Sequence, residues 1–190
     1  MIIVRHQINT VAELQAIGPE FGIEIDIRNN DRKLILHHDP WGEGEELDAF
    51  LSHYRHKLLI LNVKTEGIED RILELIKKYE IKDYFFLDVS FPFIVKMAGK
   101  GFVKNAVRFS EYESLETCLA MKGKCDWVWV DCFSRLPLTP EIYVRLKEHF
   151  KICLVSPDLL GRPAQIKEYR KMIGQMELDA VCADDWEAWQ

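Results

Sequence analysis

A Glu-Ile-Asp triplet lies inside an otherwise apolar segment, residues 22 to 27, which is predicted to form a strand. Side chains two positions apart on a strand point to the same face, so Glu24 and Asp26 should stand side by side, roughly 7 Å apart. Two carboxylates in a buried strand repel each other and lose hydration, so one must take up a proton or both must share a cation. The triplet therefore indicates a metal-binding site.

Further polar side chains come at the ends of other apolar segments. They are His6, His38, Asn62, Lys64, Asp88 and Ser90. Histidine exchanges a proton near neutral pH and suits general acid–base catalysis, and lysine offers a positive charge to an anion. Taken singly, a histidine or lysine of this kind is more often a solvated bystander. Their shared position at strand ends favours a functional site.

Eight short apolar runs alternate with segments of helical periodicity. The runs span residues 2–5, 23–28, 58–63, 84–89, 106–109, 127–131, 152–155 and 180–183. They are apolar nearly throughout, which is typical of strands covered on both faces of a parallel sheet. Thr10 with Glu13, and Thr139 before Pro140, are helix start signals. We predict an α/β fold, a compact (β/α)8 TIM barrel that forms one domain over residues 1–190.

The alternation is broken after Arg28, where the polar turn 29–32 leads to a second apolar run and then to His37 and His38. This run follows too closely for a helical crossover, so we expect an extended excursion that brings His38 back toward the acid pair. Neighbouring side chains on an extended segment point in opposite directions. At most one of the two histidines should therefore face the acids.

Composition excludes several classes of protein. With 48% hydrophobic and 29% charged residues the chain is typical of a soluble globular protein, and its net charge of -6 argues against broad nucleic-acid binding. The five cysteines form no Cys-x-x-Cys pair and are expected to be reduced thiols. No apolar run is long enough for a signal peptide core or a membrane span. We expect a cytoplasmic protein with a small ligand.

In their order along the chain, these motifs resemble those of the glycerophosphodiester phosphodiesterase family, whose fold is a TIM barrel of the phospholipase C-like phosphodiesterase type. The matching segments are His6-Gln7-Ile8-Asn9-Thr10, Glu24-Ile25-Asp26, His38-Asp39-Pro40, Asn62-Val63-Lys64, Ser90-Phe91 and Leu178–Asp184. The resemblance spans the whole chain. The short loop after His38 leaves no room for the small insertion domain of the glycerol-ester enzymes.

The resemblance implies hydrolysis of a phosphodiester by two histidines and one divalent cation, Mg²⁺ or Ca²⁺. It implies that His6 and His38 act as general acid and base, that Glu24 and Asp26 are metal ligands, and that Lys64 contacts the phosphate. The substrate would be a small-molecule or glycan phosphodiester.

Two positions depart from the family pattern. Asn62 stands where the family has a third anionic metal ligand, and its amide oxygen can still coordinate a hard cation, with lower affinity. Gln7 replaces an arginine suited to bidentate phosphate contact. Asp88, two residues before Ser90 and on the same strand face by parity, is expected to supply charge, and both residues are candidate substrate contacts.

Trp129 shares a predicted strand face with Trp127 and Asp131. Its ring is a candidate for stacking on a substrate sugar, with a place in the core as the alternative. For the chain as a whole, the alternative to hydrolysis is a non-catalytic barrel that binds phosphate or sugar after losing tight metal coordination through Asn62. A different barrel reaction with Lys64 as a Schiff-base amine is less favoured, because nearby carboxylates raise the pKa of a lysine.

Overall fold

The computed structural model describes residues 1–190, and the chain divides into two compact units. The N-terminal unit comprises Arg5–Ser90, and the C-terminal unit comprises Met1–Val4 with Phe91–Gln190. The sequence-based expectation of a single domain stays a prediction. No helix is long and apolar enough to cross a lipid bilayer.

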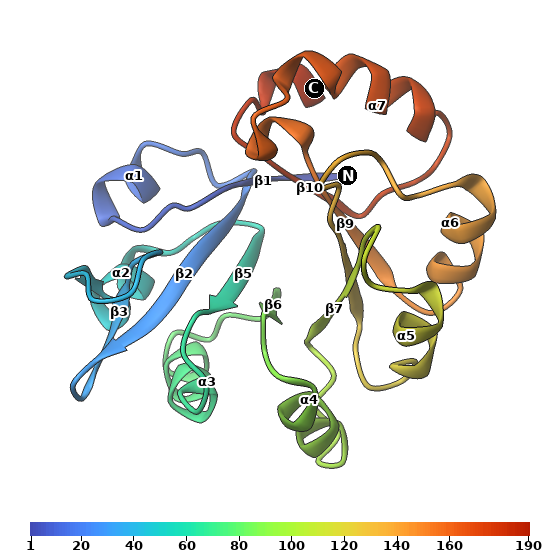
Figure 1. The fold of residues 1–190 in the computed structure, drawn as a ribbon. Coiled ribbons are helices and arrows are strands. Elements are labelled where there is room, and N and C mark those ends of the chain that lie inside the picture. Colours follow the sequence, from blue (N-terminus) through green and yellow to red (C-terminus); the bar gives the residue numbers. More distant parts are fainter. The chain divides into compact units, whose positions relative to one another are not determined.

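The strands of the N-terminal unit lie side by side in the sheet (Figure 1). Strand β2 (Gly22–Asn30) runs parallel to β5 (Leu58–Val63), and β5 runs parallel to β6 (Tyr84–Leu87). On its other edge β2 pairs antiparallel with β3 (Lys33–Leu36), which pairs with the short β4 (Glu45–Glu46). The helices of this unit are α1 (Val11–Gln15), α2 (Leu47–His53) and α3 (Glu69–Lys78).

Both faces of β2 and β5 are covered, as their apolar composition predicts. Ile23, Ile25 and Ile27 are fully buried on one face of β2, and the acid pair is buried on the other. Helix α3 buries an apolar stripe and has acidic residues in its first turn and lysines in its last, which complements the helix dipole. The predicted capping box begins α1, because the Thr10 hydroxyl accepts from the Glu13 backbone N–H and the Glu13 carboxylate accepts from Thr10 in return.

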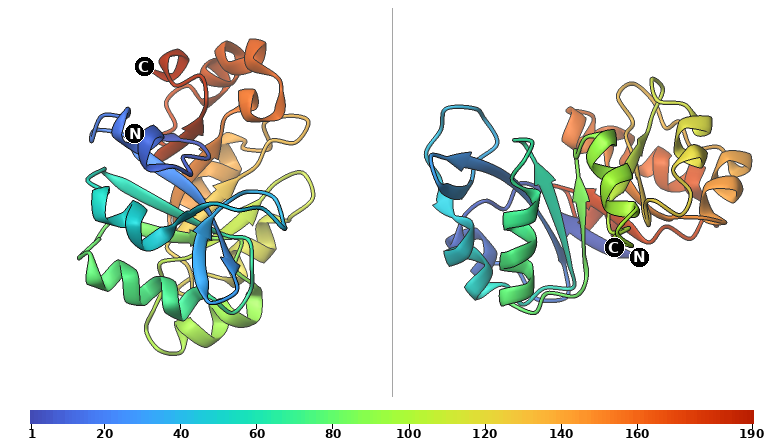
Figure 2. Two further views of the ribbon diagram at one scale, coloured as in Figure 1. Left: turned by 90° about the vertical axis from the view of Figure 1, so that its left-hand side faces the viewer. Right: turned by 90° about the horizontal axis from the view of Figure 1, so that it is seen from below.

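Strands β2 and β3 form a hairpin (blue in Figure 2). Residues 22–27 of β2 pair with β5, whereas residues 27–30 pair with β3 on the other edge. The strands are joined through Asp31, whose φ of 50° lies in the left-handed region that a tight turn requires. The predicted extended excursion after Arg28 is therefore confirmed, and it takes the form of a β-hairpin.

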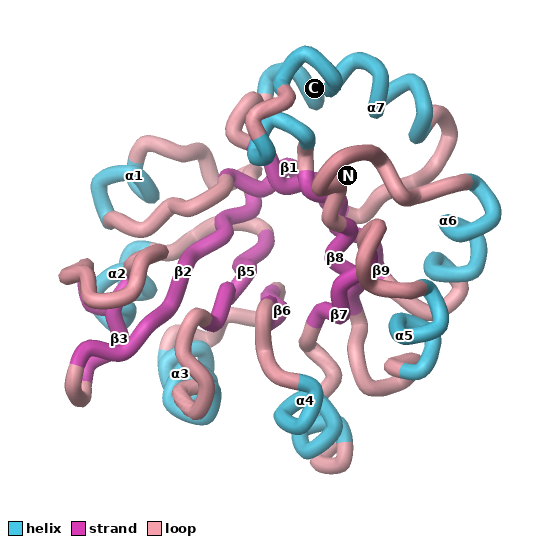
Figure 3. Tube along the Cα trace, in the orientation of Figure 1, coloured by secondary structure: helices cyan, strands magenta, loops and turns pink.

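In the C-terminal unit, the strands that are parallel neighbours in order are β7 (Ala106–Phe109), β8 (Trp127–Val130), β9 (Lys151–Val155) and β10 (Ala180–Ala183). Strand β1 (Ile2–Arg5) lies next to β10. Helices α5 (Leu115–Ala120), α6 (Pro140–Lys147) and α7 (Ile166–Ile173) lie along one side of these strands (Figure 3). The unit also contains α4 (Phe91–Ala98) and three 3₁₀ turns, at Pro157–Leu160, Pro163–Gln165 and Glu187–Trp189.

All eight predicted strands are present, with small changes at their ends. One change matters for the site. Strand β6 ends at Leu87 and not at residue 89, because Asp88 has a φ of 62° and leaves the extended conformation. The parity argument that placed Asp88 and Ser90 on one strand face is therefore wrong.

Candidate active site

Glu24 and Asp26 lie side by side on β2, and both are buried, with exposed fractions of 1% and 0%. Asn62 of β5 is in register with Asp26, and its amide nitrogen Nδ2 donates to both acids, at 2.8 Å from Glu24 Oε1 and 3.2 Å from Asp26 Oδ1. Because one amide reaches both carboxylates, the acids point to the same side of the strand. The expected acid pair is present.

The segment between β1 and α1 provides further donors to the acids. The Gln7 backbone N–H donates to Glu24 Oε2 at 2.8 Å, and the Asn9 amide donates to Asp26 Oδ2 at 3.1 Å. Asn9 also accepts from the Asp26 backbone N–H at 2.9 Å. Gln7 has a φ of 52°, a strained backbone conformation for a residue other than glycine. Every oxygen of the two carboxylates thus accepts a hydrogen bond from this chain.

Lys64, just after β5, contributes the positive charge of the site. Its Nζ lies 3.4 Å from Asp26 Oδ1 and 3.6 Å from Asp88 Oδ2, and its side chain is 19% exposed. Asp88 therefore lies near the acid pair, although its backbone has left the strand. The ammonium group and the two amides compensate part of the negative charge that burial makes costly.

Burial raises the pKa of Glu24 to about 7, and repulsion from Asp26 acts in the same direction. Hydrogen bonds from Gln7 and Asn62 and the charge of Lys64 offset part of this effect. In the absence of a cation, Glu24 therefore exchanges a proton near neutral pH.

His38 lies in the loop after β3, and its side chain is about half exposed, at 52%. Its ring nitrogen Nδ1 is 2.8 Å from Asp39 Oδ1, and Nε2 has no partner within the protein. The Arg28 guanidinium donates to the His38 carbonyl at 2.7 and 3.0 Å and to the Lys64 carbonyl at 3.2 Å. Arg28 thereby holds the His38 loop against the end of β5.

His37 has a different set of contacts. Its Nδ1 lies 2.9 Å from the Asp39 carbonyl and accepts from the Asp39 backbone N–H at 3.1 Å. The ring covers Gly42 so closely that a Cβ at that position would lie 2.2 Å from it. His37 therefore holds the loop, and His38 offers a free ring nitrogen.

His6 follows β1 and is half-buried, and the next residue, Gln7, donates its N–H to Glu24. The Ser90 hydroxyl donates to Glu66 at 2.6 Å. Trp129, in the C-terminal unit, is 5% exposed and donates through Nε1 to Asp131, which is ion-paired with Arg108. Its burial favours the core role over sugar stacking.

Two contributors were missed by the sequence reasoning. They are Asn9, which hydrogen-bonds to Asp26, and Arg28, which fixes the His38 loop. Arg28 lies two positions after Asp26, so strand periodicity was the signal that could have placed its side chain at the same end of the sheet.

The structure has no group of three or more histidine, cysteine or acidic side chains placed to hold a metal ion. The third polar side chain beside the two acids is the amide of Asn62, on β5. Its Oδ1 is buried and has no hydrogen-bond partner. A flip of the amide exchanges its oxygen and nitrogen positions, so Asn62 can present either atom to the acids. Two carboxylates and one amide oxygen are a donor set that fits a hard divalent cation.

No protein-family model and no curated protein matches the sequence. Among solved structures, a glycerophosphodiester phosphodiesterase from Agrobacterium tumefaciens matches with a TM-score of 0.72 and 16% identity, over 100% of this chain and 98% of that chain. An Oleispira antarctica phosphodiesterase in complex with its product sn-glycerol-3-phosphate matches with a TM-score of 0.66 and 16% identity, over 100% and 95%.

A mutant tryptophan synthase α-subunit from Pyrococcus furiosus also matches, with a TM-score of 0.56 and 14% identity, over 96% of this chain and 85% of that chain. At these identities the similarity concerns the fold alone, and one fold supports several chemistries. The chain has the fold of the glycerophosphodiester phosphodiesterases, a (β/α)8 barrel in a compact form of 190 residues without an inserted domain.

Proposed function

We propose that this chain hydrolyses phosphodiesters, with His6 and His38 as general acid and base. The observation that carries the proposal is the buried acid pair on β2, bridged by Asn62 and in contact with Lys64. Burying two carboxylates has a large free-energy cost, and a structural role would be met more cheaply by apolar side chains.

In the proposed reaction, one histidine removes a proton from the attacking hydroxyl as its oxygen bonds to phosphorus. The other protonates the leaving alkoxide as its phosphorus–oxygen bond breaks. The contact between His38 Nδ1 and Asp39 supports this role, because a carboxylate at Nδ1 orients the ring and leaves Nε2 free for proton exchange. The Lys64 ammonium would bind the phosphate oxygens as a point charge.

Glu24, Asp26 and the Oδ1 atom of Asn62 would hold the divalent cation, Mg²⁺ or Ca²⁺. The position of the Asn62 amide against both carboxylates supports this assignment, because a flip of the amide would turn Oδ1 toward the acids as a third oxygen ligand. When bound, such an ion withdraws negative charge from the non-bridging phosphate oxygens. The substrate would be a small-molecule or glycan phosphodiester, which is in line with the sn-glycerol-3-phosphate product bound to the Oleispira antarctica enzyme.

A second candidate is a non-catalytic barrel that binds phosphate or sugar. One observation favours it: Asn62 Nδ2 donates to both acids and Lys64 Nζ lies 3.4 Å from Asp26, so this chain itself compensates the carboxylates. A binding barrel of this kind would be stabilised by phosphate esters without hydrolysing them.

The two candidates are separated by assaying bis(p-nitrophenyl) phosphate hydrolysis with Mg²⁺, Ca²⁺, Mn²⁺ or a chelator. The parent protein, Asn62→Glu and Asn62→Gln are compared, because glutamate and glutamine have the same length and differ in charge. We expect cation-dependent hydrolysis that increases in Asn62→Glu and not in Asn62→Gln. No hydrolysis in any condition, together with thermal stabilisation by phosphate esters, would support the binding barrel.

A further inference from the structure

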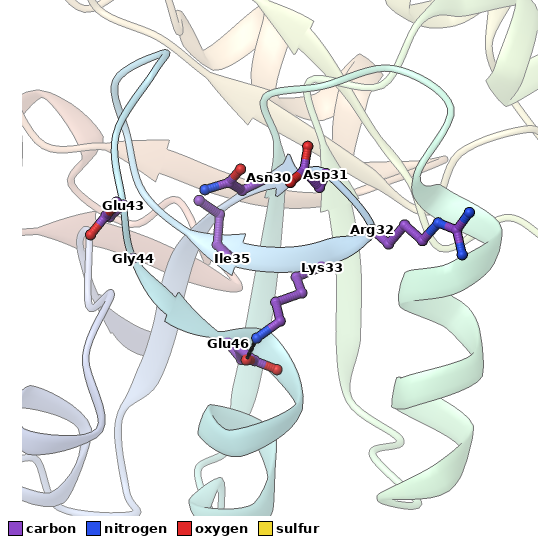
Figure 4. Close-up of a pocket in the computed structure, with 8 residues that line it drawn as sticks. All are labelled: Asn30, Asp31, Arg32, Lys33, Ile35, Glu43, Gly44 and Glu46. Carbon is purple, nitrogen blue, oxygen red and sulfur yellow. Dashed lines mark hydrogen bonds and ion pairs between the residues drawn. The ribbon is translucent and has the colours of Figure 1, made fainter.

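An open groove lies between the β2–β3 hairpin and the loop of residues 39–46. One part has a volume of about 710 Å³ and is drawn in Figure 4. An adjoining part of about 570 Å³ extends toward Arg28 and Thr65. The two parts share Asn30, Asp31, Ile35 and Glu43, so they form one continuous surface.

Trp41 stands at the rim of this groove and is fully exposed, at 100%. Its φ of 67° lies in the left-handed region, which is rare for a bulky residue. The loop that carries it is fixed, because the His37 ring covers Gly42 and the Leu36 carbonyl packs against Gly44. A large aromatic ring is thus presented to solvent with no packing role in this chain.

The polar groups of the groove suit a neutral ligand. Three basic and three acidic side chains line it and balance in charge: Arg28, Arg32, Lys33, Asp31, Glu43 and Glu46. Lys33 is ion-paired with Glu46, and Arg32 points away from the other lining side chains (Figure 4). The Asn29 and Asn30 side-chain amides are exposed and have no hydrogen-bond partner in the protein. An aromatic face beside free amides matches a polyhydroxylated molecule, which offers C–H groups and hydroxyls.

The groove adjoins the candidate active site through Arg28. This side chain lines the groove, and its guanidinium donates to the carbonyls of His38 and Lys64. Thr65, the residue after Lys64, also lines the groove. We therefore expect a phosphodiester bound at Lys64 to extend one of its alcohol groups toward the groove.

We propose that the groove binds a neutral sugar or cyclitol that forms one of the two esters of the substrate, with its ring stacked on Trp41 and its hydroxyls bonded to the side-chain amide of Asn30. This inference rests on the proposed function, because the phosphate at Lys64 brings the sugar to the groove. It names the class of alcohol that the site selects.

The first test measures binding apart from turnover. Methyl glucosides and myo-inositol are titrated into the parent protein and into Trp41→Ala, Asn30→Ala and Tyr112→Ala, with binding followed by NMR line shifts of the probes. Tyr112 is a matched control, since it is an aromatic residue 80% exposed on the C-terminal unit. We expect Trp41→Ala to weaken binding by about tenfold and Tyr112→Ala to leave it unchanged.

The second test compares turnover of glycerophosphoinositol with that of glycerophosphoethanolamine, whose alcohol groups contain no ring. We expect Trp41→Ala to raise KM for glycerophosphoinositol by about tenfold and to leave the second substrate within about twofold. Trp41-dependent sugar binding without any hydrolysis would uphold the groove and contradict the proposed function. Hydrolysis with no effect of Trp41→Ala on sugar binding or KM would overturn the groove alone. Trp41-dependent binding to phosphatidylcholine vesicles, with no sugar binding, would also overturn it.

Discussion

The two proposed functions, hydrolysis and binding without hydrolysis, require different orientations of the Asn62 amide. With Nδ2 toward the acids it compensates their charge, and with Oδ1 toward them it adds a cation ligand. The other atom of the amide is then buried without a partner, as Oδ1 is here. Burial raises the pKa of Glu24 to about 7, and the hydrogen bond from Asn62 Nδ2 acts to lower it. The orientation of the amide therefore also affects the protonation of Glu24.

Replacing Asn62 by leucine should lower the free energy of unfolding by about 1–3 kcal/mol, because two buried acids lose a donor. The measurement is urea denaturation at pH 8, where Glu24 carries its charge. Asn105→Leu is the matched control. Asn105 is buried like Asn62, but neither atom of its amide has a partner, so its replacement should be neutral or stabilising. Equal losses in both variants would contradict the bridging role of Asn62.

The two proposed acid–base histidines should matter equally to turnover. His6→Ala and His38→Ala are each expected to lower kcat by about a hundred- to ten-thousandfold, with the far-ultraviolet circular dichroism spectrum unchanged. His53→Ala serves as the control, since His53 makes only a surface contact with Gln15. Parent-like kcat in either proposed catalytic variant would remove that residue from the mechanism.

At the scale of elements, the β2–β3 hairpin and the loop after it extend beyond the parallel strands and carry functional side chains of their own. The loop presents His38 and Trp41, and its return depends most on Gly44, where there is no room for a side chain. A Cβ at Gly42 would meet the His37 ring, which is able to move, whereas a Cβ at Gly44 would lie 2.1 Å from the Leu36 carbonyl oxygen.

Gly44→Ala should therefore destabilise the protein, by about 1–3 kcal/mol in thermal or urea unfolding, because the clash is with backbone. We expect kcat to fall as well, since the His38 loop must shift. Gly99→Ala is the control, because its Cβ would lie no closer than 3.4 Å to any neighbour. Identical unfolding midpoints for Gly44→Ala and Gly99→Ala would show that the loop is not held as described.

In the C-terminal unit, Glu111 fixes the loop after β8. Its carboxylate accepts from the backbone N–H groups of Phe133, Ser134 and Arg135. Burial acts to raise the pKa of Glu111, but these hydrogen bonds outweigh it and lower the pKa to about 2. A carboxyl with a lowered folded-state pKa stabilises the fold above its ordinary value of about 4.5.

That stabilisation should be lost as pH falls from about 4.5 toward 2. Glu111→Gln is expected to remove this part of the acid sensitivity and to cost about 1 kcal/mol at neutral pH, a value reduced for solvent screening. Unfolding free energies at several pH values provide the test. Asp131, whose pKa burial raises to about 6, acts in the opposite direction and at higher pH, so the two contributions separate. If the free energy of unfolding of Glu111→Gln falls between pH 4.5 and pH 2 as steeply as that of the parent protein, this account is contradicted.

At the scale of the molecule, the alternation of strands and helices was predictable because burial imposes it. Runs such as residues 58–63 are apolar on both faces, and caps such as Thr139 with Pro140 mark helix starts. Strand periodicity also placed Glu24 beside Asp26. Backbone exceptions were not predictable: a positive φ at Asp88 has no signature in one sequence. Nor was the orientation of the Asn62 amide, which depends on hydrogen bonds to two acids of the neighbouring strand.

The fold does not decide the chemistry. The same architecture is found in phosphodiesterases and in a tryptophan synthase α-subunit. The proposed activity therefore depends on the acids, lysine and histidines of the N-terminal unit and not on the barrel.

The central claim is tested most directly by phosphodiester hydrolysis in the purified parent protein and in His38→Ala, measured across a titration of Mg²⁺ or Ca²⁺ after chelation. The account predicts hydrolysis that rises with the cation, saturates, and is lost in His38→Ala. Absence of hydrolysis at every cation concentration, or equal hydrolysis by the two proteins, would contradict it.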